Sequence, residues 1–190
     1  MYEECISQKE MSTTMKQGII SLIPKPDKDI LLIDNWLPIT LLTIDYKIVS
    51  LAFANRLKTG LDNIVAETQS GFMKGRHISN NIRLVLDVHS KAFILFLNFY
   101  KAFDTIEHGF LIECLKLFGF GTRFVEIIDM FYKGINSTVI LNFNTSQRFD
   151  IKRGVRQGCP ISPFLFILVV IHKYFPNPDL KGISVFDREI

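Results

Sequence analysis

The chain has 190 residues, a length typical of a single domain. Hydrophobic residues make up 48% of the sequence and charged residues 22%, so the chain can bury a sizeable core and is not intrinsically disordered. The net charge of +3 is too small to indicate a partner by itself. The apolar runs are far shorter than the roughly 20 residues of a membrane span, and the acidic start MYEECISQKE is unlike a secretory signal. We therefore expect neither export nor membrane insertion, and an intracellular location.

The cysteines give no sign of a disulfide framework or a zinc site. Cys5, Cys114 and Cys159 form no CxxC pair and are odd in number. This use of cysteine favours a reducing compartment and argues against a disulfide-linked partner.

The hydrophobic pattern of the first half predicts a strand and a long helix. Residues 17–25 read as a strand that prolines close. From Thr43 the spacing becomes helical. The expected buried stripe consists of Phe53, Leu57, Leu61 and Val65, continued upstream by Ile44 and Ile48. A glycine-containing loop and a short helix at about 81–89 follow.

The second half begins with an apolar segment, residues 92–99, which we expect to be a strand buried on both faces. Asn98 is its polar exception. Asp104 and Glu107 have the spacing of a helix cap and its reciprocal acid, which predicts a helix to about Phe118. The remaining expected elements are a helix that Thr122 caps, a hairpin of residues 138–143 and 147–152, an irregular turn at 154–160, and a final helix from about Pro163. This order predicts an α+β or mixed α/β domain with a central sheet.

Basic residues concentrate just before the final helix. Between Gln147 and Arg156 four cations stand against one acid, Asp150; the cations are Arg148, Lys152, Arg153 and Arg156. Such clusters are most often solvated turns, and a role facing phosphate groups is the alternative. The four histidines lack metal-ligand spacing, Cys159 lacks a recognisable partner, and no glycine-rich phosphate-binding string occurs.

Four blocks of sequence resemble one family in its own order. They are SLIPKPDKD with NWLPITLLTIDYKIVSLAFANRLK, then QSGFMKGRHISNNIR, then FLNFYKAFDTIEH, then KRGVRQGCPISPFLF, with KGISVFDREI trailing. Here the chain resembles the reverse transcriptase domain of LINE-type retrotransposons, which lack long terminal repeats. Within that family, the sequence of these blocks most resembles the Tx1-like branch. The resemblance implies a right-hand polymerase, with fingers at about 16–90 and part of a palm at about 91–190, after an N-terminal extension of residues 1–15. It also implies Mg²⁺, an RNA template and a DNA primer, the reaction being the copying of RNA into DNA.

The resemblance assigns roles to individual positions. Lys25 matches a lysine near the triphosphate of the incoming nucleotide, and Phe103 matches the aromatic residue that excludes a 2′-hydroxyl. Gln157 and Gly158 match the segment that faces the nascent base pair and the primer. The expected contacts with the template backbone are Lys74, Arg76, Arg153 and Arg156. Without the family match, Lys25 would equally be a solvated turn residue, and Phe103 a packing residue.

The chain departs from the family at its metal site. Polymerases of this kind hold two Mg²⁺ ions between carboxylates of neighbouring strands, and Asn98 occupies the position of the first acid. The chain also stops at Ile190, before the Ala-Asp-Asp segment and the thumb. Leu37 stands where the family usually has arginine, and we interpret Asp104 as a helix cap and not as a substitute acid.

These departures predict that no Mg²⁺ binds productively and that the chain is catalytically inactive, a degenerate fragment that Asp at position 98 alone would not rescue. The alternatives are a non-enzymatic RNA- or DNA-binding module with weak affinity, and an unselected relic product.

Overall fold

The computed structural model of the chain describes residues 2–87 and 101–174, the last four as backbone only. The expected strand at 92–99, with Asn98, and the trailing segment at 181–190 lie outside the described residues. The helices are α1 (Tyr2–Gln8), α2 (Thr13–Lys16), α3 (Ile44–Leu61), α4 (Ile78–Leu86), α5 (His108–Leu117), α6 (Thr122–Tyr132) and α7 (Ser162–Tyr174), with 3₁₀ turns η1 (Ile33–Asn35) and η2 (Ala102–Asp104). The strands are β1 (Gln17–Pro24), β2 (Trp36–Leu42), β3 (Asn136–Leu141), β4 (Asn144–Thr145) and β5 (Phe149–Asp150).

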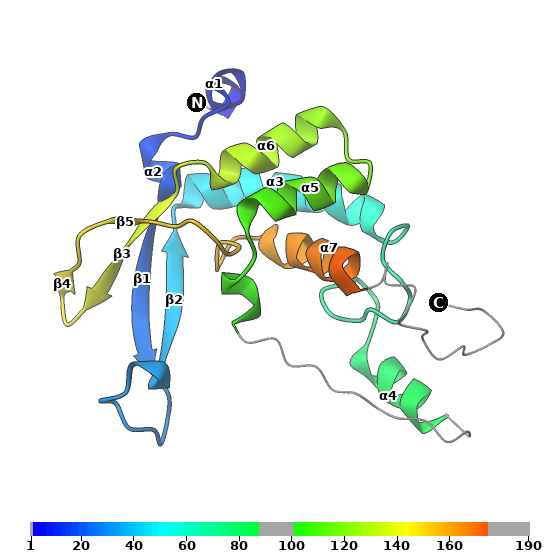
Figure 1. Ribbon diagram of the computed structural model, residues 1–190, viewed down its shortest axis with the longest axis horizontal. Helices are drawn as coiled ribbons and strands as arrows, with labels where there is room; N and C mark the ends of the chain where they lie inside the picture. Colours follow the sequence, from blue (N-terminus) through cyan, green and yellow to red (C-terminus); the bar gives the residue numbers. More distant parts are fainter. Residues whose placement is uncertain (1, 88–100, 175–190) are drawn as a thin grey trace.

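The strands form one mixed sheet at one end of the molecule, and α3, α5, α6 and α7 pack together beside it (Figure 1). The strand order is β2-β1-β3-β4, and β5 also pairs with β3. β1 and β2 are antiparallel, whereas β1 and β3 are parallel, with Gln17 opposite Asn136. The mixed α/β fold expected from the sequence is thus present, and it is consistent with a fragment of polymerase fingers and palm.

β4 lies in the segment expected to be the turn of the hairpin, and β2 is a further strand that the sequence pattern did not predict. Pro38 lies in its middle, opposite Leu22, and proline within an apolar run argues against a central strand because it has no N–H to donate. β2 is at the edge of the described sheet, however, where one side of the strand has no ladder to complete. The proline is therefore tolerated.

The buried face of α3 differs from the expected stripe at its start. Phe53, Leu57 and Leu61 are buried as expected, but Ile44 is 75% exposed and Ile48 is 54% exposed. Tyr46 and Ser50 continue the buried face instead, and both are fully buried. A helix has 3.6 residues per turn, so a strict spacing of four drifts around its surface and leaves the core after about two turns.

The helix expected to begin at Asp104 begins four residues later, so the predicted cap is wrong. α5 starts at His108 with Glu107 at its N-cap, and Asp104 ends the 3₁₀ turn η2. The physical reason is tertiary: the carbonyls of Phe103 and Ile106 accept hydrogen bonds from Val155 and Gly154. Those carbonyls would otherwise serve the first turn of a longer helix. The expected end is confirmed, with Gly119 at φ +76° after the helix.

The core joins the N-terminal residues to the four central helices. Phe131 of α6 meets Tyr46 and Phe53 of α3 edge-on, at ring-centroid distances of 5.5 and 5.8 Å. Met11 and Met15 are buried in the same cluster, so these two residues before β1 pack onto the domain. Among the described residues, no helix is both long enough and apolar enough to span a membrane.

Candidate functional site

A short backbone pairing joins the segment 103–107 to the turn 153–158. Val155 N donates to Phe103 O at 2.7 Å, and Gly154 N donates to Ile106 O at 2.6 Å. Glu107 and Arg153 form an isolated antiparallel bridge next to them. These two segments belong to the third and fourth of the sequence blocks that carry the resemblance. The described parts of the two blocks therefore meet in the structure.

Two glycines make this approach possible. A Cβ on Gly154, which has φ +89°, would lie 3.0 Å from Asp104 Cα and 3.1 Å from the Phe103 carbonyl oxygen. A Cβ on Gly158, at φ +74°, would lie 3.0 Å from the Thr40 carbonyl oxygen of β2. Both positions thus need glycine for their backbone conformation and for space. The turn is clamped between η2 on one side and the sheet on the other.

A pocket of about 270 Å³ opens between this turn and the sheet. Its polar lining residues are Thr40, Asp104, Asn136, Ser137, Arg153, Arg156 and Gln157. Gln157 Nε2 donates a hydrogen bond to Asp104 Oδ1 at 3.2 Å. Gln157 and Arg153 were expected at a binding site, whereas no local pattern marks Thr40 and Asn136, and the spacing of Asp104 indicated a helix cap.

Phe103 lies beside this turn with its ring held by the last helix. It stacks on Phe166 of α7 at a centroid distance of 4.7 Å and an interplanar angle of 25°. The ring is half-buried, so one part packs against α7 and another part remains accessible. Both interpretations of Phe103, packing and binding, fit this position.

The structure gives Arg156 a different role from the expected contact with a template. The residue is only 6% exposed. Nη1 donates to Met15 O at 2.9 Å, and Nη2 donates to Lys16 O and Gln17 O, both at 3.3 Å. The guanidinium also lies 4.1 Å from the ring centre of the buried Tyr46. The charge is therefore directed inward, where it ties the turn to the start of β1.

Arg156→Met should lower the free energy of unfolding by about 2–4 kcal/mol, because it leaves three carbonyl acceptors without their donor in a buried place. Urea denaturation measures this change. Arg148→Met is the matched control, since Arg148 is exposed and donates to the side chain of another residue, Asn136 Oδ1, at 3.1 Å. Equal losses for the two variants would contradict the structural role of Arg156.

His108 supports the same turn from the first residue of α5. Its Nε2 lies 3.0 Å from the Gly154 carbonyl oxygen, and its ring packs on Tyr132 at 4.7 Å. Burial lowers the pKa of His108 from its ordinary value, while the Gly154 carbonyl and Asp129 act in the opposite direction. The folded state thus favours the neutral ring more than the unfolded chain does.

The sign of this shift predicts a loss of stability as the pH falls below about 6.5, the ordinary histidine value. There the unfolded chain takes up a proton that folded His108 resists. The melting temperature should fall by about 1–3 °C between pH 7 and pH 5.5, and His108→Gln, which keeps a donor but does not titrate, should flatten this dependence. Thermal melts across this range provide the measurement, and an unchanged slope in the variant would exclude His108 as its source.

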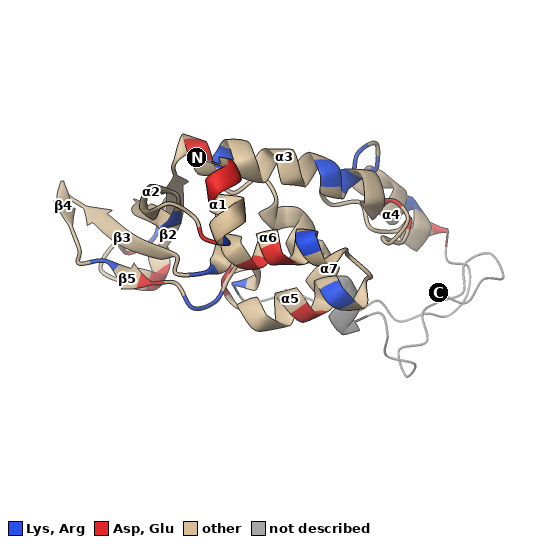
Figure 2. Ribbon diagram, turned by 90° about the horizontal axis from the view of Figure 1, so that it is seen from above, with Lys and Arg blue, Asp and Glu red and all other residues tan. Residues whose placement is uncertain are grey.

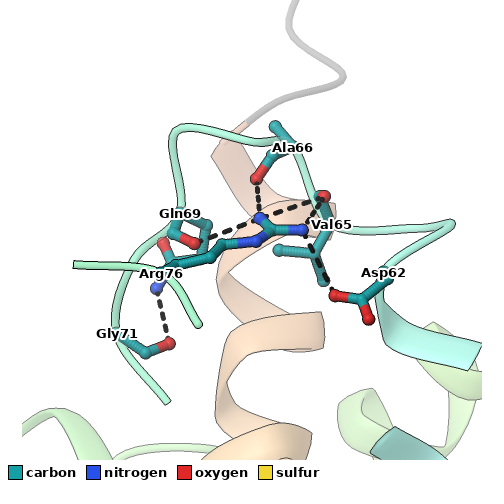
Figure 3. A network of polar contacts seen from close by, with 6 residues as sticks. All are labelled: Asp62, Val65, Ala66, Gln69, Gly71 and Arg76. Carbon is teal, nitrogen blue, oxygen red and sulfur yellow. Dashed lines mark hydrogen bonds and ion pairs between the residues drawn. The ribbon is translucent and has the colours of Figure 1, made fainter. Parts of the chain in front are cut away.

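Arg76 also binds the protein itself. Its guanidinium donates to the carbonyl oxygens of Val65, Ala66 and Gln69, and Nη2 lies 3.4 Å from Asp62 Oδ1 (Figure 3). Its side chain is 17% exposed. The expected contact with a template is therefore replaced by a local role, in which Arg76 closes the loop after α3. Lys74, in the same loop, is exposed.

Lys25 occupies the loop that joins β1 and β2, and its Nζ donates to Asp34 O at 2.8 Å. Leu37, at the position where an arginine was expected from the resemblance, is 47% exposed on β2. In Figure 1 this hairpin tip and the loop before α4 lie at opposite sides of the molecule. The structure therefore does not bring Lys25 together with Lys74 or Arg76.

The basic cluster before α7 is divided by the fold. Arg148, Lys152 and Arg153 are exposed, and Figure 2 shows basic stretches on either side of β5. Arg156, the fourth member, is the buried one.

Within residues 2–87 and 101–174 no group of three His, Cys, Asp or Glu side chains could hold a metal ion. Asn98 lies outside those ranges, so its expected metal position has no geometry to compare.

The sequence model of the family described as "Reverse transcriptase (RNA-dependent DNA polymerase)" matches residues 23–178. A Transposon TX1 uncharacterized 149 kDa protein of Xenopus laevis is 37% identical over 175 residues, which are 88% of this chain and 13% of that protein. The polyprotein of the type-2 retrotransposable element R2DM of Drosophila melanogaster is 33% identical over 109 residues, 54% of this chain and 10% of that protein. A polyprotein of the type-1 retrotransposable element R2 of Popillia japonica is 28% identical over 159 residues, 79% of this chain and 22% of that protein.

The match over residues 23–178 defines the class of this chain, that of reverse transcriptase domains. The chain belongs to the reverse transcriptase family, and its relatives are retrotransposons without long terminal repeats. It spans between a tenth and a quarter of the length of these relatives.

Proposed function

We propose that this domain holds the end of a DNA primer paired with an RNA template, with the terminal base pair or the nucleotide at the pocket beside Gln157. The family match over residues 23–178 carries the proposal. The meeting of Phe103, Gln157 and Gly158 at one turn supports it, because these residues were assigned to nucleotide and primer independently of any structure.

The same proposal includes the loss of catalysis, on the ground of Asn98. An amide has nearly the shape of a carboxylate but carries no charge, and one of its terminal atoms is a donor that repels a cation. Near a divalent ion, at an effective dielectric of about 20, the missing unit charge forfeits several kcal/mol. Each ~1.4 kcal/mol of activation free energy is a tenfold change in reaction rate. This substitution alone should therefore lower the rate of nucleotide addition by several powers of ten.

The chain should give no extended product with a primed RNA template, Mg²⁺ and all four deoxynucleotides, although it should retain the primed template in a gel shift. The reason is the missing charge at position 98, which leaves the metal weakly held. Extension above the level without protein would contradict the proposed inactivity.

A direct test of position 98 is the binding of Mn²⁺, followed by electron paramagnetic resonance. Asn98→Asp should bind Mn²⁺ at least about tenfold more tightly than the parent chain, because the restored charge attracts the ion. Asn98→Gln, which keeps a neutral amide, should not. Equal affinity in all three proteins would remove Asn98 as the cause.

A non-enzymatic nucleic-acid-binding module is the second candidate, and two exposed cations favour it: Arg153, which lines the pocket, and Lys152, its neighbour in the chain. Such binding would be indifferent to sequence and sensitive to salt, because cations on phosphate release counterions.

We also propose an intracellular, reducing location; the three unpaired thiols, all buried, are compatible with it.

The double variant Lys152→Glu, Arg153→Glu should weaken retention of a primed RNA template at low salt, because two phosphate contacts become repulsive. The slope of log affinity against log salt should decrease in magnitude by about 1.4–1.8. Fluorescence anisotropy at a series of salt concentrations measures it. Lys116→Glu, Arg123→Glu, which reverses two exposed cations on α5 and α6, is the control. An equal loss in the control would indicate an effect of net charge only.

A further inference from the structure

Asp104 and Gln157 form a pair at the mouth of the pocket. Gln157 Nε2 donates to Asp104 Oδ1 at 3.2 Å, and both residues line the cavity of about 270 Å³. Asp104 is exposed and Gln157 is half-buried. Asp104 does not cap α5, which begins at His108, so its carboxylate is available for this contact.

The backbone fixes the distance between the two residues. Phe103 O and Ile106 O, on either side of Asp104, accept from Val155 N and Gly154 N at 2.7 and 2.6 Å. The absence of a side chain at Gly154 lets the two segments approach until Asp104 Cα would lie 3.0 Å from a Cβ there. The backbone part of the entropy cost is therefore already met by the fold, and the pairing has to restrict only the rotation of the two side chains.

The chemistry of the pair is directional. An ionised carboxylate only accepts hydrogen bonds, whereas the glutamine amide has a donor end and an acceptor end. When Asp104 takes one Nε2 hydrogen, the amide can no longer turn its oxygen toward the carboxylate without repulsion. The amide oxygen Oε1 is then kept free to accept a hydrogen bond from a ligand.

We propose that Asp104 is a positioning residue that sets the orientation of the Gln157 amide, so that Oε1 accepts a hydrogen bond from a hydroxyl group of the nucleotide or of the primer end. This inference rests on the proposed function, since it concerns the same pocket. Asp104 acts through Gln157, and the turn itself stays in place through Arg156 and the backbone pairing. Substitution of Asp104 therefore leaves the fold intact.

The pairing is tested first without any nucleic acid, through the side-chain amide resonances of Gln157 in the ¹⁵N-labelled 190-residue chain. In the parent chain one of the two Nε2 protons should be shifted downfield, and the two should be well separated. Asp104→Ala should bring them together, and Asp45→Asn, which neutralises an exposed carboxylate on α3, should not. Unchanged resonances in Asp104→Ala would overturn the proposal.

Binding is tested with a poly(rA) template primed with oligo(dT), in the presence of dTTP, by fluorescence anisotropy. Asp104→Ala should weaken retention about threefold to tenfold, the range of one hydrogen bond. Gln157→Glu should weaken it about tenfold, because two carboxylates then face each other. The exchanged pair Asp104→Asn, Gln157→Glu should recover to within about threefold of the parent chain. In that variant the amide introduced at position 104 would donate to the carboxylate introduced at position 157, whose second oxygen stays available as the acceptor.

The two experiments separate failure of the inference from failure of the proposed function. An exchanged pair that binds no better than Gln157→Glu overturns the positioning role, even where the parent chain binds the primed template. A parent chain that binds no primed template at low salt refutes the proposed function and, with it, the role of Oε1 toward a ligand. The resonances would then still decide whether Asp104 orients Gln157.

Discussion

The burial of the Arg156 guanidinium is the constraint on which the rest of the site depends. A buried charge is costly unless it is fully hydrogen-bonded, and here three backbone carbonyls at the junction of α2 and β1, together with the Tyr46 ring, surround it. Since Gln157 and Gly158 follow directly in the chain, their positions relative to the sheet are set by this contact. The pocket exists because the turn cannot move away from β1.

Arg76 and Arg156, to which the resemblance assigns contacts with the template backbone, both direct their guanidinium groups into the protein. Both lie in basic segments of the sequence, which are most often solvated turns. In the fold each guanidinium satisfies carbonyls that a loop would otherwise leave unpaired. The planar group with five donors suits this task better than lysine, and both neighbouring lysines, Lys74 and Lys152, remain exposed.

The sequence was informative wherever local rules decide the structure. β1, the end of α5 at Gly119 and the start of α7 near Pro163 follow from strand pattern, glycine conformation and the preference of proline for a first turn. It failed where a distant segment competes for backbone groups. Asp104 has the spacing of a cap, yet Gly154 and Val155, about 50 residues away, take the carbonyls of that turn. The identity of the pocket lining could not be predicted for the same reason, because Thr40, Asp104 and Asn136 are brought together only by the sheet and the turn.

The parallel pairing of β1 with β3 has a consequence for how the protein is made. Gln17 pairs with Asn136, and Met15 binds Arg156 across a separation of 141 residues. During synthesis at about 5–20 residues per second, Met15 is therefore made about 7–28 seconds before Arg156, whereas β2 reaches β1 sooner. The contacts that join the two ends of the domain thus form late in synthesis, because most of the chain separates them.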